Sequence, residues 1–171
     1  MARAAIDCYH TYFDRAGRFE CRVYDGIPEL LRALVDDGRP VAVATSKRKP
    51  NALAIIEHCG LLGFLDAVCG PSPGDLHATK AESITAALAA LRVSPGRDVV
   101  LVGDRSQDVV GAHDVGIACV GVAWGYGSRD ELAGADAFVS DVDELARLLG
   151  VTLSVQAEGS AIPSVGDEAL A

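Results

Sequence analysis

The sequence predicts an α/β protein built on a doubly wound parallel sheet. Short, nearly continuous apolar runs rich in β-branched residues alternate along the chain with segments whose apolar residues recur at helical spacing. Apolar runs of this kind are typical of strands that are buried on both faces, and such strands belong to parallel sheets. The alternation of strand and helix therefore predicts helices on both faces of the sheet.

Four strands and four helices are expected. The strands are the apolar runs 41–44, 99–102, 117–122 and 137–139. Each helix has apolar residues at positions i, i+3, i+4 and i+7, which would form one buried stripe. These stripes are Ile27, Leu30, Leu31 and Leu34; Ala52, Ile55, Ile56 and Cys59; Ile84, Ala87, Leu88 and Leu91; and Val142, Leu145, Ala146 and Leu149.

Residues that start and end helices agree with this order. Two Ser/Thr-x-x-Glu patterns predict capping boxes, and two glycines stand where helix C-caps are expected. They are Thr79 with Glu82, Ser128 with Glu131, Gly38, and Gly60. The first 20 residues differ, because Ile6, Tyr9 and Phe13 indicate a short amphipathic helix with no strand before it. The segment 154–171 has no periodicity and predicts a disordered tail.

Composition and charge argue against several classes of function. The net charge of −9 and the lack of a basic cluster argue against a nucleic-acid partner. No apolar run approaches the length of about 20 residues that crosses a bilayer, so no membrane partner and a cytoplasmic location are expected. The five cysteines are odd in number and contain no Cys-x-x-Cys pair, which argues against a disulfide framework and a zinc site. Most of them are expected to be buried, and the histidines receive no role.

A first candidate site follows the strand 41–44, which runs directly into Thr45, Ser46 and Lys47. Ligands collect at the carboxyl ends of parallel strands, where a hydroxyl and consecutive backbone N–H groups can hold a phosphate oxygen. The alternative is a Thr or Ser that ends a strand and caps the next helix.

The second candidate is Lys80, which follows the cap residue Thr79 and so lies in the first turn of a helix. The helix dipole disfavours a cation there by roughly 0.3–1 kcal/mol. A lysine directed into the crevice would pair with a bound phosphate and with nearby carboxylates. The alternative is a solvated surface lysine.

The third candidate is the sequence Gly-Asp-Arg-Ser-Gln-Asp after the strand 99–102, in which Asp104 and Asp108 lie one helical turn apart. Carboxylate oxygens at a strand end suit Mg²⁺, which takes one or two carboxylates together with waters and substrate phosphate. In the alternative, Asp104 caps the helix with Gln107 at position N3, and Asp108 only complements the dipole.

Taken in this order, the three candidates resemble the second, third and fourth motifs of the haloacid dehalogenase-like phosphatases. The segments 23–30, 44–47, 79–82 and 121–128 are most similar to the phosphoglycolate phosphatase-like branch, and the resemblance covers about residues 5–150. It implies that Thr45 and Ser46 bind the phosphoryl group and that Lys80 neutralises its charge. It also implies that Asp104 ligates Mg²⁺ and that Asp108 supports the site.

The family's nucleophile is the first Asp of an Asp-x-Asp-x-Thr motif at the end of the first strand, and this motif is not found. The nearest mimic, residues 7–11, has Tyr9 at the second acidic position and no buried strand ahead of it. Asp141 and Asp143 are better interpreted as acids in the first turn of the last helix.

The resemblance therefore implies a Rossmann-type core at 21–150 that lacks its first strand. Residues 1–20 would be a remnant of the family's helical cap domain, and residues 151–171 a tail. The expected function is a Mg²⁺-dependent phosphatase that acts on a small phosphorylated metabolite, such as phosphoglycolate, through an aspartyl-phosphate. Catalysis by this chain alone is in doubt without the aspartate. The strands 41–44 and 99–102 would lose a shared neighbour, so self-association is also expected.

Two other functions stay open. An inactive domain could keep the phosphate pocket for binding, or serve as an interaction module. A phosphoacceptor receiver domain combines similar residues, but its acids precede the Thr and Lys in the chain, whereas here they follow.

Overall fold

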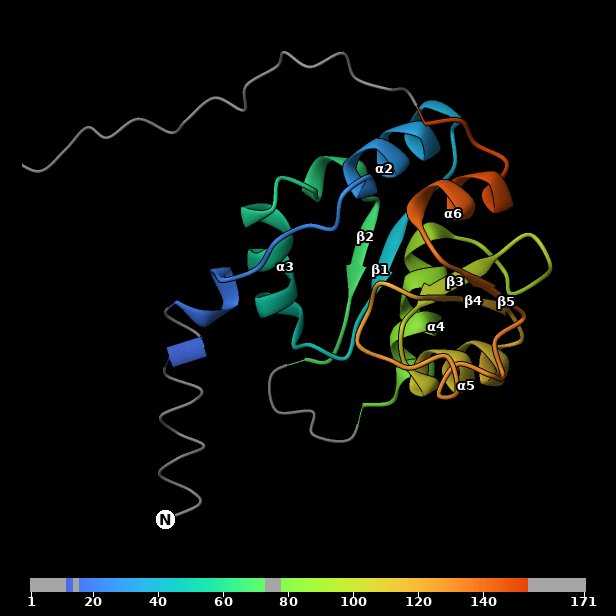
Figure 1. The fold of residues 1–171 in the computed structure, drawn as a ribbon. Helices are drawn as coiled ribbons and strands as arrows, with labels where there is room; N and C mark the ends of the chain where they lie inside the picture. The colour runs from blue at the N-terminus through green and yellow to red at the C-terminus, as the bar shows by residue number, and fades with distance from the viewer. Residues whose placement is uncertain (1–11, 14–15, 73–77, 154–171) are drawn as a thin grey trace, which may run out of the picture.

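The computed structural model describes residues 12–13, 16–72 and 78–153 (Figure 1). Its helices and strands alternate as the sequence predicts. In chain order they are η1 (Gly17–Phe19), α2 (Ile27–Asp36), β1 (Ala42–Ala44), α3 (Lys49–His58), η2 (Leu62–Phe64), β2 (Ala67–Cys69), α4 (Lys80–Leu91), β3 (Val100–Gly103), α5 (Ser106–Val115), β4 (Ala118–Val122), β5 (Ala137–Val139) and α6 (Val142–Leu149).

All strand pairs are parallel, and they form two separate sheets. One contains β1 and β2, with Val43 opposite Val68. The other has the order β3-β4-β5, with Val102 opposite Val120 and Val122 opposite Val139. Among the described residues no strand pairing joins β1 to β3, so each of these two strands has one unpaired edge.

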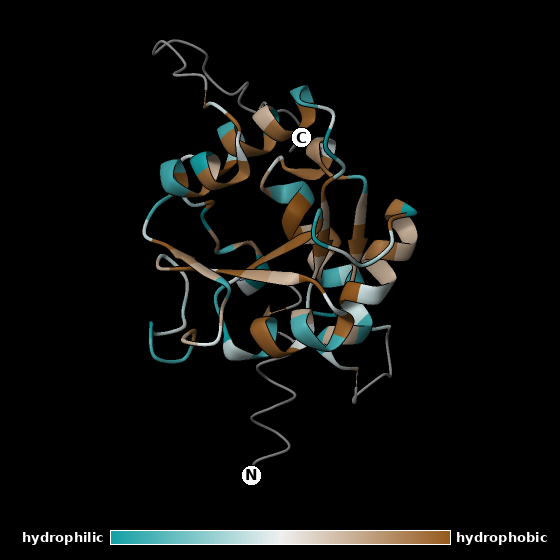
Figure 2. Cartoon of the chain, turned by 90° about the vertical axis from the view of Figure 1, so that its right-hand side faces the viewer, coloured by the Kyte–Doolittle hydropathy of each residue, from teal (hydrophilic) through white to brown (hydrophobic). Residues whose placement is uncertain are grey.

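Helices cover both faces of the larger sheet, which confirms the doubly wound α/β architecture. On one face, α2 and α6 pack over β4 and β5 around a buried cluster that includes Leu30, Val122 and Leu145. On the other, α4 and α5 enclose a second cluster that includes Ile84 and Cys119. The strands are mostly apolar and lie between helices of mixed hydropathy (Figure 2). Apolar burial between these layers is the main source of the fold's stability.

The predicted helix ends are confirmed with one exception. Thr79 and Glu82 form a complete capping box at the start of α4. Gly38 and Gly60 follow α2 and α3 with φ of +73° and +68°, a region that favours glycine. The box predicted at Ser128 is wrong, because residues 129–134 form turns.

Two elements lie outside the predicted set. The strand β2 has only three residues, Ala67–Cys69, which is too short an apolar run to stand out from a loop. Helix α5 buries Asp108 and Gly111 together with Val109 and Ala112, so its buried face is not a continuous apolar stripe. In both cases the tertiary neighbours, and not local periodicity, define the element.

The predicted amino-terminal helix and the predicted tail fall mostly outside the described residues. Within the described ranges, no helix has the length and hydropathy needed to cross a bilayer. The expectation that most cysteines are buried is confirmed for Cys69 and Cys119, whereas Cys21 is exposed and Cys59 is half-buried.

Candidate active site

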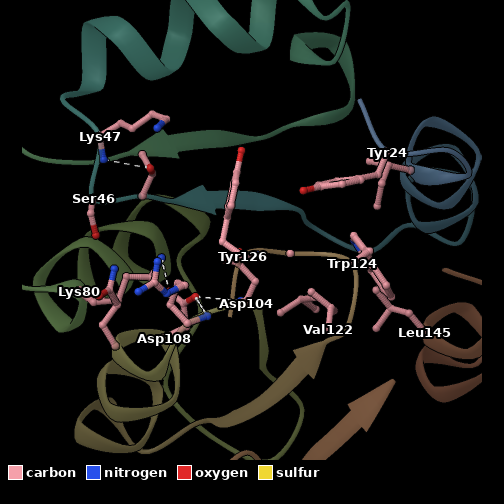
Figure 3. A pocket seen from close by; sticks show the side chains of 17 residues that line it. Tyr24, Ser46, Lys47, Lys80, Asp104, Asp108, Val122, Trp124, Tyr126 and Leu145 are labelled. Carbon is pink, nitrogen blue, oxygen red and sulfur yellow. Dashed lines mark hydrogen bonds and ion pairs between the residues drawn. The ribbon is translucent and has the colours of Figure 1, made fainter. Parts of the chain in front are cut away.

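The predicted site residues lie around one pocket of about 680 Å³ at the carboxyl ends of β1 and β3. Thr45, Ser46, Lys80, Asp104 and Asp108 all line it. In Figure 3 the charged side chains gather on one side of the pocket, opposite apolar side chains that include Val122, Trp124 and Leu145. The three motifs, far apart in the sequence, therefore contribute to a single site.

Lys80 forms a buried ion pair at the floor of this site. Its Nζ lies 2.8 Å from Asp108 Oδ1, and the two side chains are only 14% and 7% exposed. The same Nζ donates to the carbonyl oxygen of Ala44, at the end of β1, at 2.7 Å. The alternative of a solvated surface lysine is therefore wrong. The cost of a cation in the first turn of α4 is offset by these two partners.

Asp108 also fixes the backbone that follows β3. Its Oδ2 accepts the N–H groups of Asp104 and Arg105, both at 3.0 Å. The N-cap of α5 is thus Arg105, with Asp108 at position N3. The alternative with Asp104 as cap and Gln107 at N3 is wrong, because the helix starts one residue later. Asp108 therefore positions both Lys80 and the loop after β3.

Asp104 is held by the loop 124–127. The backbone N–H of Tyr126 donates to Asp104 Oδ2 at 2.7 Å, and no described residue donates to Oδ1. A Cβ atom added at Gly125 would overlap the Asp104 side chain, and one added at Gly127 would overlap its carbonyl oxygen. The Gly-Tyr-Gly sequence therefore lets this loop approach Asp104 closely enough to orient its carboxylate.

Thr45 lies in a fixed turn directly after β1. Its N–H donates to the carbonyl of Cys69 at 2.9 Å, its carbonyl accepts from Ser83 Oγ at 3.1 Å, and its Oγ1 accepts the N–H of Lys47 at 3.1 Å. Helix α3 begins after Arg48 without a side-chain cap. Neither Thr45 nor Ser46 caps this helix, so the capping alternative is wrong. The proton of the Thr45 hydroxyl remains available to a ligand in the pocket.

Sequence reasoning missed an ion pair at the rim of the pocket. Arg105 Nε lies 2.8 Å from Glu131 Oε1, which also accepts the N–H of Ser106 at 3.0 Å. The hydrogen bond that Arg105 donates to Glu131 lowers the pKa of Glu131 and raises the pKa of Arg105. The Ser128-x-x-Glu131 pattern suggested a capping box and not an ion pair with Arg105. Ser128 Oγ does accept the Glu131 N–H, but the Glu131 carboxylate points toward α5.

Gly103 is tightly packed against Asp108 of the ion pair with Lys80, so a larger residue at this position should destabilise the fold. A Cβ atom at this position would overlap the Asp108 side chain. We expect Gly103→Ala to lower the free energy of unfolding by about 1–3 kcal/mol, as for other overpacked sites. Urea denaturation measures the effect. Gly63→Ala is the control, because a Cβ atom there meets nothing within 4 Å. Equal stability of the two variants would contradict the packing described for Asp108.

No unengaged carboxylate lies in the pocket among the described residues. Its acidic lining residues are Asp104 and Asp108, which are held as described. Asp141 is the N-cap of α6 and accepts the N–H of Glu144 at 2.7 Å, which confirms its helix-start role. The mimic at residues 7–11 lies outside the described residues.

Comparison with known proteins places the chain in a family. The family model described as "Haloacid dehalogenase-like hydrolase" matches residues 2–122, well over half of the chain. The chain therefore belongs to the haloacid dehalogenase-like hydrolases, as its motifs predict.

Individual relatives carry the names of a kinase as well as of phosphatases. The chain is 38% identical over 154 residues to the tyrosine-protein kinase PtkA of Mycobacterium tuberculosis, covering 88% of this chain and 53% of the relative. It is also 38% identical over 128 residues to a 5′-nucleotidase of Pseudomonas aeruginosa, covering 75% and 58%. A crystal structure of a predicted phosphatase from Clostridium acetobutylicum superimposes with a TM-score of 0.80 at 41% identity, covering 85% and 68% of the two chains. The chain thus spans a little over half the length of these curated relatives.

Proposed function

We propose that this chain is the phosphate- and metal-binding part of a phosphatase that hydrolyses small phosphate monoesters. The observation that carries the proposal is the convergence of Thr45, Lys80 and Asp104 on one pocket at the ends of β1 and β3. Phosphoryl transfer needs positioning and charge stabilisation at the phosphoryl oxygens, and these residue types supply both.

Each of the residues has a distinct role in this proposal. The Thr45 hydroxyl and the backbone N–H of Ser46 donate to phosphoryl oxygens. Lys80 places its charge beside the group in transfer, and Asp108 holds Lys80 there through the 2.8 Å ion pair. Because Lys80 is fixed before substrate binds, little reorganisation is needed as charge develops in the transition state.

The residues present fit a Mg²⁺ site with one protein carboxylate in its first shell. Asp104 Oδ1 has no donor among the described residues, while Oδ2 is engaged by Tyr126. No group of three or more His, Cys, Asp or Glu side chains that could bind a metal occurs within the described part of the chain. A site with Asp104 as its one carboxylate ligand matches Mg²⁺, which takes one or two carboxylates and completes its coordination with water and phosphate. When bound, it would stabilise negative charge on the phosphoryl oxygens.

The nucleophilic aspartate would reach the pocket on a strand placed between β1 and β3. Within the described ranges, both strands have an unpaired edge and both end at the pocket, so a third parallel strand between them would also end there. Val122 of β4 is 5% exposed, but Val100 and Val102 of the adjacent β3 are 37% and 40% exposed. Apolar side chains of this kind at a strand edge favour a further strand as neighbour.

In the complete site, the carboxylate of that strand would attack phosphorus, break the ester P–O bond and release the alcohol, leaving an aspartyl-phosphate. Water would then hydrolyse the aspartyl-phosphate, which releases inorganic phosphate and restores the carboxylate. Relatives named as 5′-nucleotidase and phosphoglycolate phosphatase indicate a small phosphorylated metabolite as substrate. The second candidate is a phosphate-binding or interaction module without turnover. The absence of an unengaged carboxylate among the described pocket residues favours it for the chain in isolation.

The roles of Asp104 and Lys80 can be separated in a fusion that carries, ahead of this chain, the preceding segment of the P. aeruginosa relative. Asp104→Asn should keep the acceptor for Tyr126 but raise the Mg²⁺ concentration needed for half-maximal turnover at least tenfold. Lys80→Ala should lower turnover by about 10²–10³-fold with a small change in Mg²⁺ dependence.

Hydrolysis of p-nitrophenyl phosphate across a Mg²⁺ titration measures both effects, with circular dichroism to confirm that the variants fold. Asp114→Asn, an exposed acid on α5, is the matched control. A Mg²⁺ dependence that Asp104→Asn leaves unchanged would contradict the metal assignment.

A further inference from the structure

Two thiols lie side by side on the surface away from the pocket. Cys21 follows η1, and Cys59 is the C-cap residue of α3, 38 positions later in the sequence. Their Sγ atoms are 3.6 Å apart, with Cys21 exposed and Cys59 half-buried. Neither residue lines the pocket, and the site chemistry uses neither.

Other contacts fix this approach. Arg18 Nη1 donates to Asn51 Oδ1 on α3 at 3.4 Å, and the rings of Phe19 and His58 are 5.0 Å apart. Segment 17–21 is therefore docked along α3, near the start of the helix at Asn51 and at its end at His58. The proximity of the thiols follows from this docking and not from one mobile side chain.

Metal binding is a poorer explanation of the pair than covalent chemistry. A soft metal ion would be expected to take further Cys or His ligands. No group of three or more candidate ligands occurs where the structure describes the chain. Cys69 and Cys119 are buried elsewhere in the fold. A disulfide needs only two sulfur atoms, and an approach from 3.6 Å to a bonding distance of about 2.05 Å is a small displacement for an exposed residue in an irregular segment.

We propose that Cys21 and Cys59 are a site of reversible disulfide formation by exchange with a low-molecular-weight disulfide such as oxidised glutathione. The Cys21 thiolate attacks one sulfur of glutathione disulfide, forming a mixed disulfide and releasing one glutathione thiolate. The Cys59 thiolate then attacks Cys21 Sγ, forms the intrachain bond and releases the second glutathione. The protein loses two hydrogens, and one molecule of glutathione disulfide becomes two of glutathione.

The order of attack follows from exposure. Partial burial, and then the adjacent Cys21 thiol, raise the pKa of Cys59 to about 11. Cys59 is therefore the poorer first nucleophile at neutral pH, and the accessible Cys21 reacts first. Once the mixed disulfide has formed, Cys59 is already adjacent to the sulfur it must attack.

The bond would close a loop that contains α2, β1 and the phosphate-binding turn. Tyr24, three positions after Cys21, lines the pocket, and α3 begins two positions after Lys47. Oxidation would therefore link covalently the segment that precedes Tyr24 and the helix that follows the phosphate-binding turn. It would also stabilise the fold, because the bridge restricts the unfolded chain. This inference stands on the thiol geometry and is independent of the phosphatase proposal.

The test treats the purified chain with oxidised glutathione at pH 8, with dithiothreitol as the reversing agent. Peptide mapping by mass spectrometry should find Cys21 linked to Cys59, with two fewer thiols titrated after denaturation. The melting temperature should rise by about 5–10 °C and return on reduction. Cys21→Ser and Cys59→Ser should each abolish the rise.

Two results would overturn the proposal. Glutathione could stay on Cys21 as a mixed disulfide, or the mapped bridge could join other cysteines. The thermal and mapping readouts do not depend on enzymatic activity, so a failure here is distinguishable from failure of the proposed function.

Discussion

Replacing Asp108 with alanine is expected to lower the free energy of unfolding by about 3–5 kcal/mol, the usual cost of removing one partner of a buried ion pair. Lys80 would lose its carboxylate at 2.8 Å while its side chain stays only 14% exposed. The N–H groups of Asp104 and Arg105 would lose their shared acceptor at the same time. The loss is large because one residue satisfies three donors in a buried place.

Urea denaturation with a fitted m-value measures this change. Asp114→Ala is the matched control, because Asp114 is an exposed acid in the same helix. Asp108→Asn should give an intermediate loss, since it keeps an acceptor for the backbone while removing the charge. A loss below about 1 kcal/mol for Asp108→Ala would show that the pair is solvated and that Asp108 does not organise the site.

A strand supplied between β1 and β3 is expected to raise the free energy of unfolding and to prevent self-association. In the described part of the chain, Val100 and Val102 are exposed and two strand edges are unpaired, so we expect the chain alone to have low stability and to self-associate. Fusion to the preceding segment of the P. aeruginosa 5′-nucleotidase should give a monomer with a higher free energy of unfolding. Size-exclusion chromatography and urea denaturation of the two proteins measure this. A monomeric chain with the stability of the fusion would show that the sheet needs no further strand.

The sequence predicted those parts of the fold that local patterns encode. Strand β5 lies at the predicted residues, and the capping box at Thr79 and the glycines after α2 and α3 were found from spacing alone. The site residues were also predicted, because each follows a strand or a cap, and such positions converge in a parallel sheet. Such motifs can be recognised in the sequence without information on long-range contacts.

The sequence could not show side-chain contacts that only the tertiary structure creates. Glu131 carries a capping-box signal, but its carboxylate binds Arg105 and Ser106, which only the packed fold brings near. The proximity of Cys21 and Cys59 depends on η1 docking against α3, and the wide spacing of the cysteines gave no hint of it. The overlap that requires Gly125 likewise depends on Asp104, a side chain from another segment.

We propose that Thr45, Lys80 and Asp104 form a phosphoryl-transfer site that an aspartate from an inserted strand completes. One experiment measures the initial rate of p-nitrophenyl phosphate hydrolysis with Mg²⁺ for the isolated chain, for the fusion, and for the fusion with the first aspartate of the family's Asp-x-Asp-x-Thr motif changed to asparagine. We expect turnover in the fusion only, with the other two proteins at the rate of the buffer blank. Mg²⁺-dependent turnover by the isolated chain, or an asparagine variant as active as the fusion, would contradict the proposal.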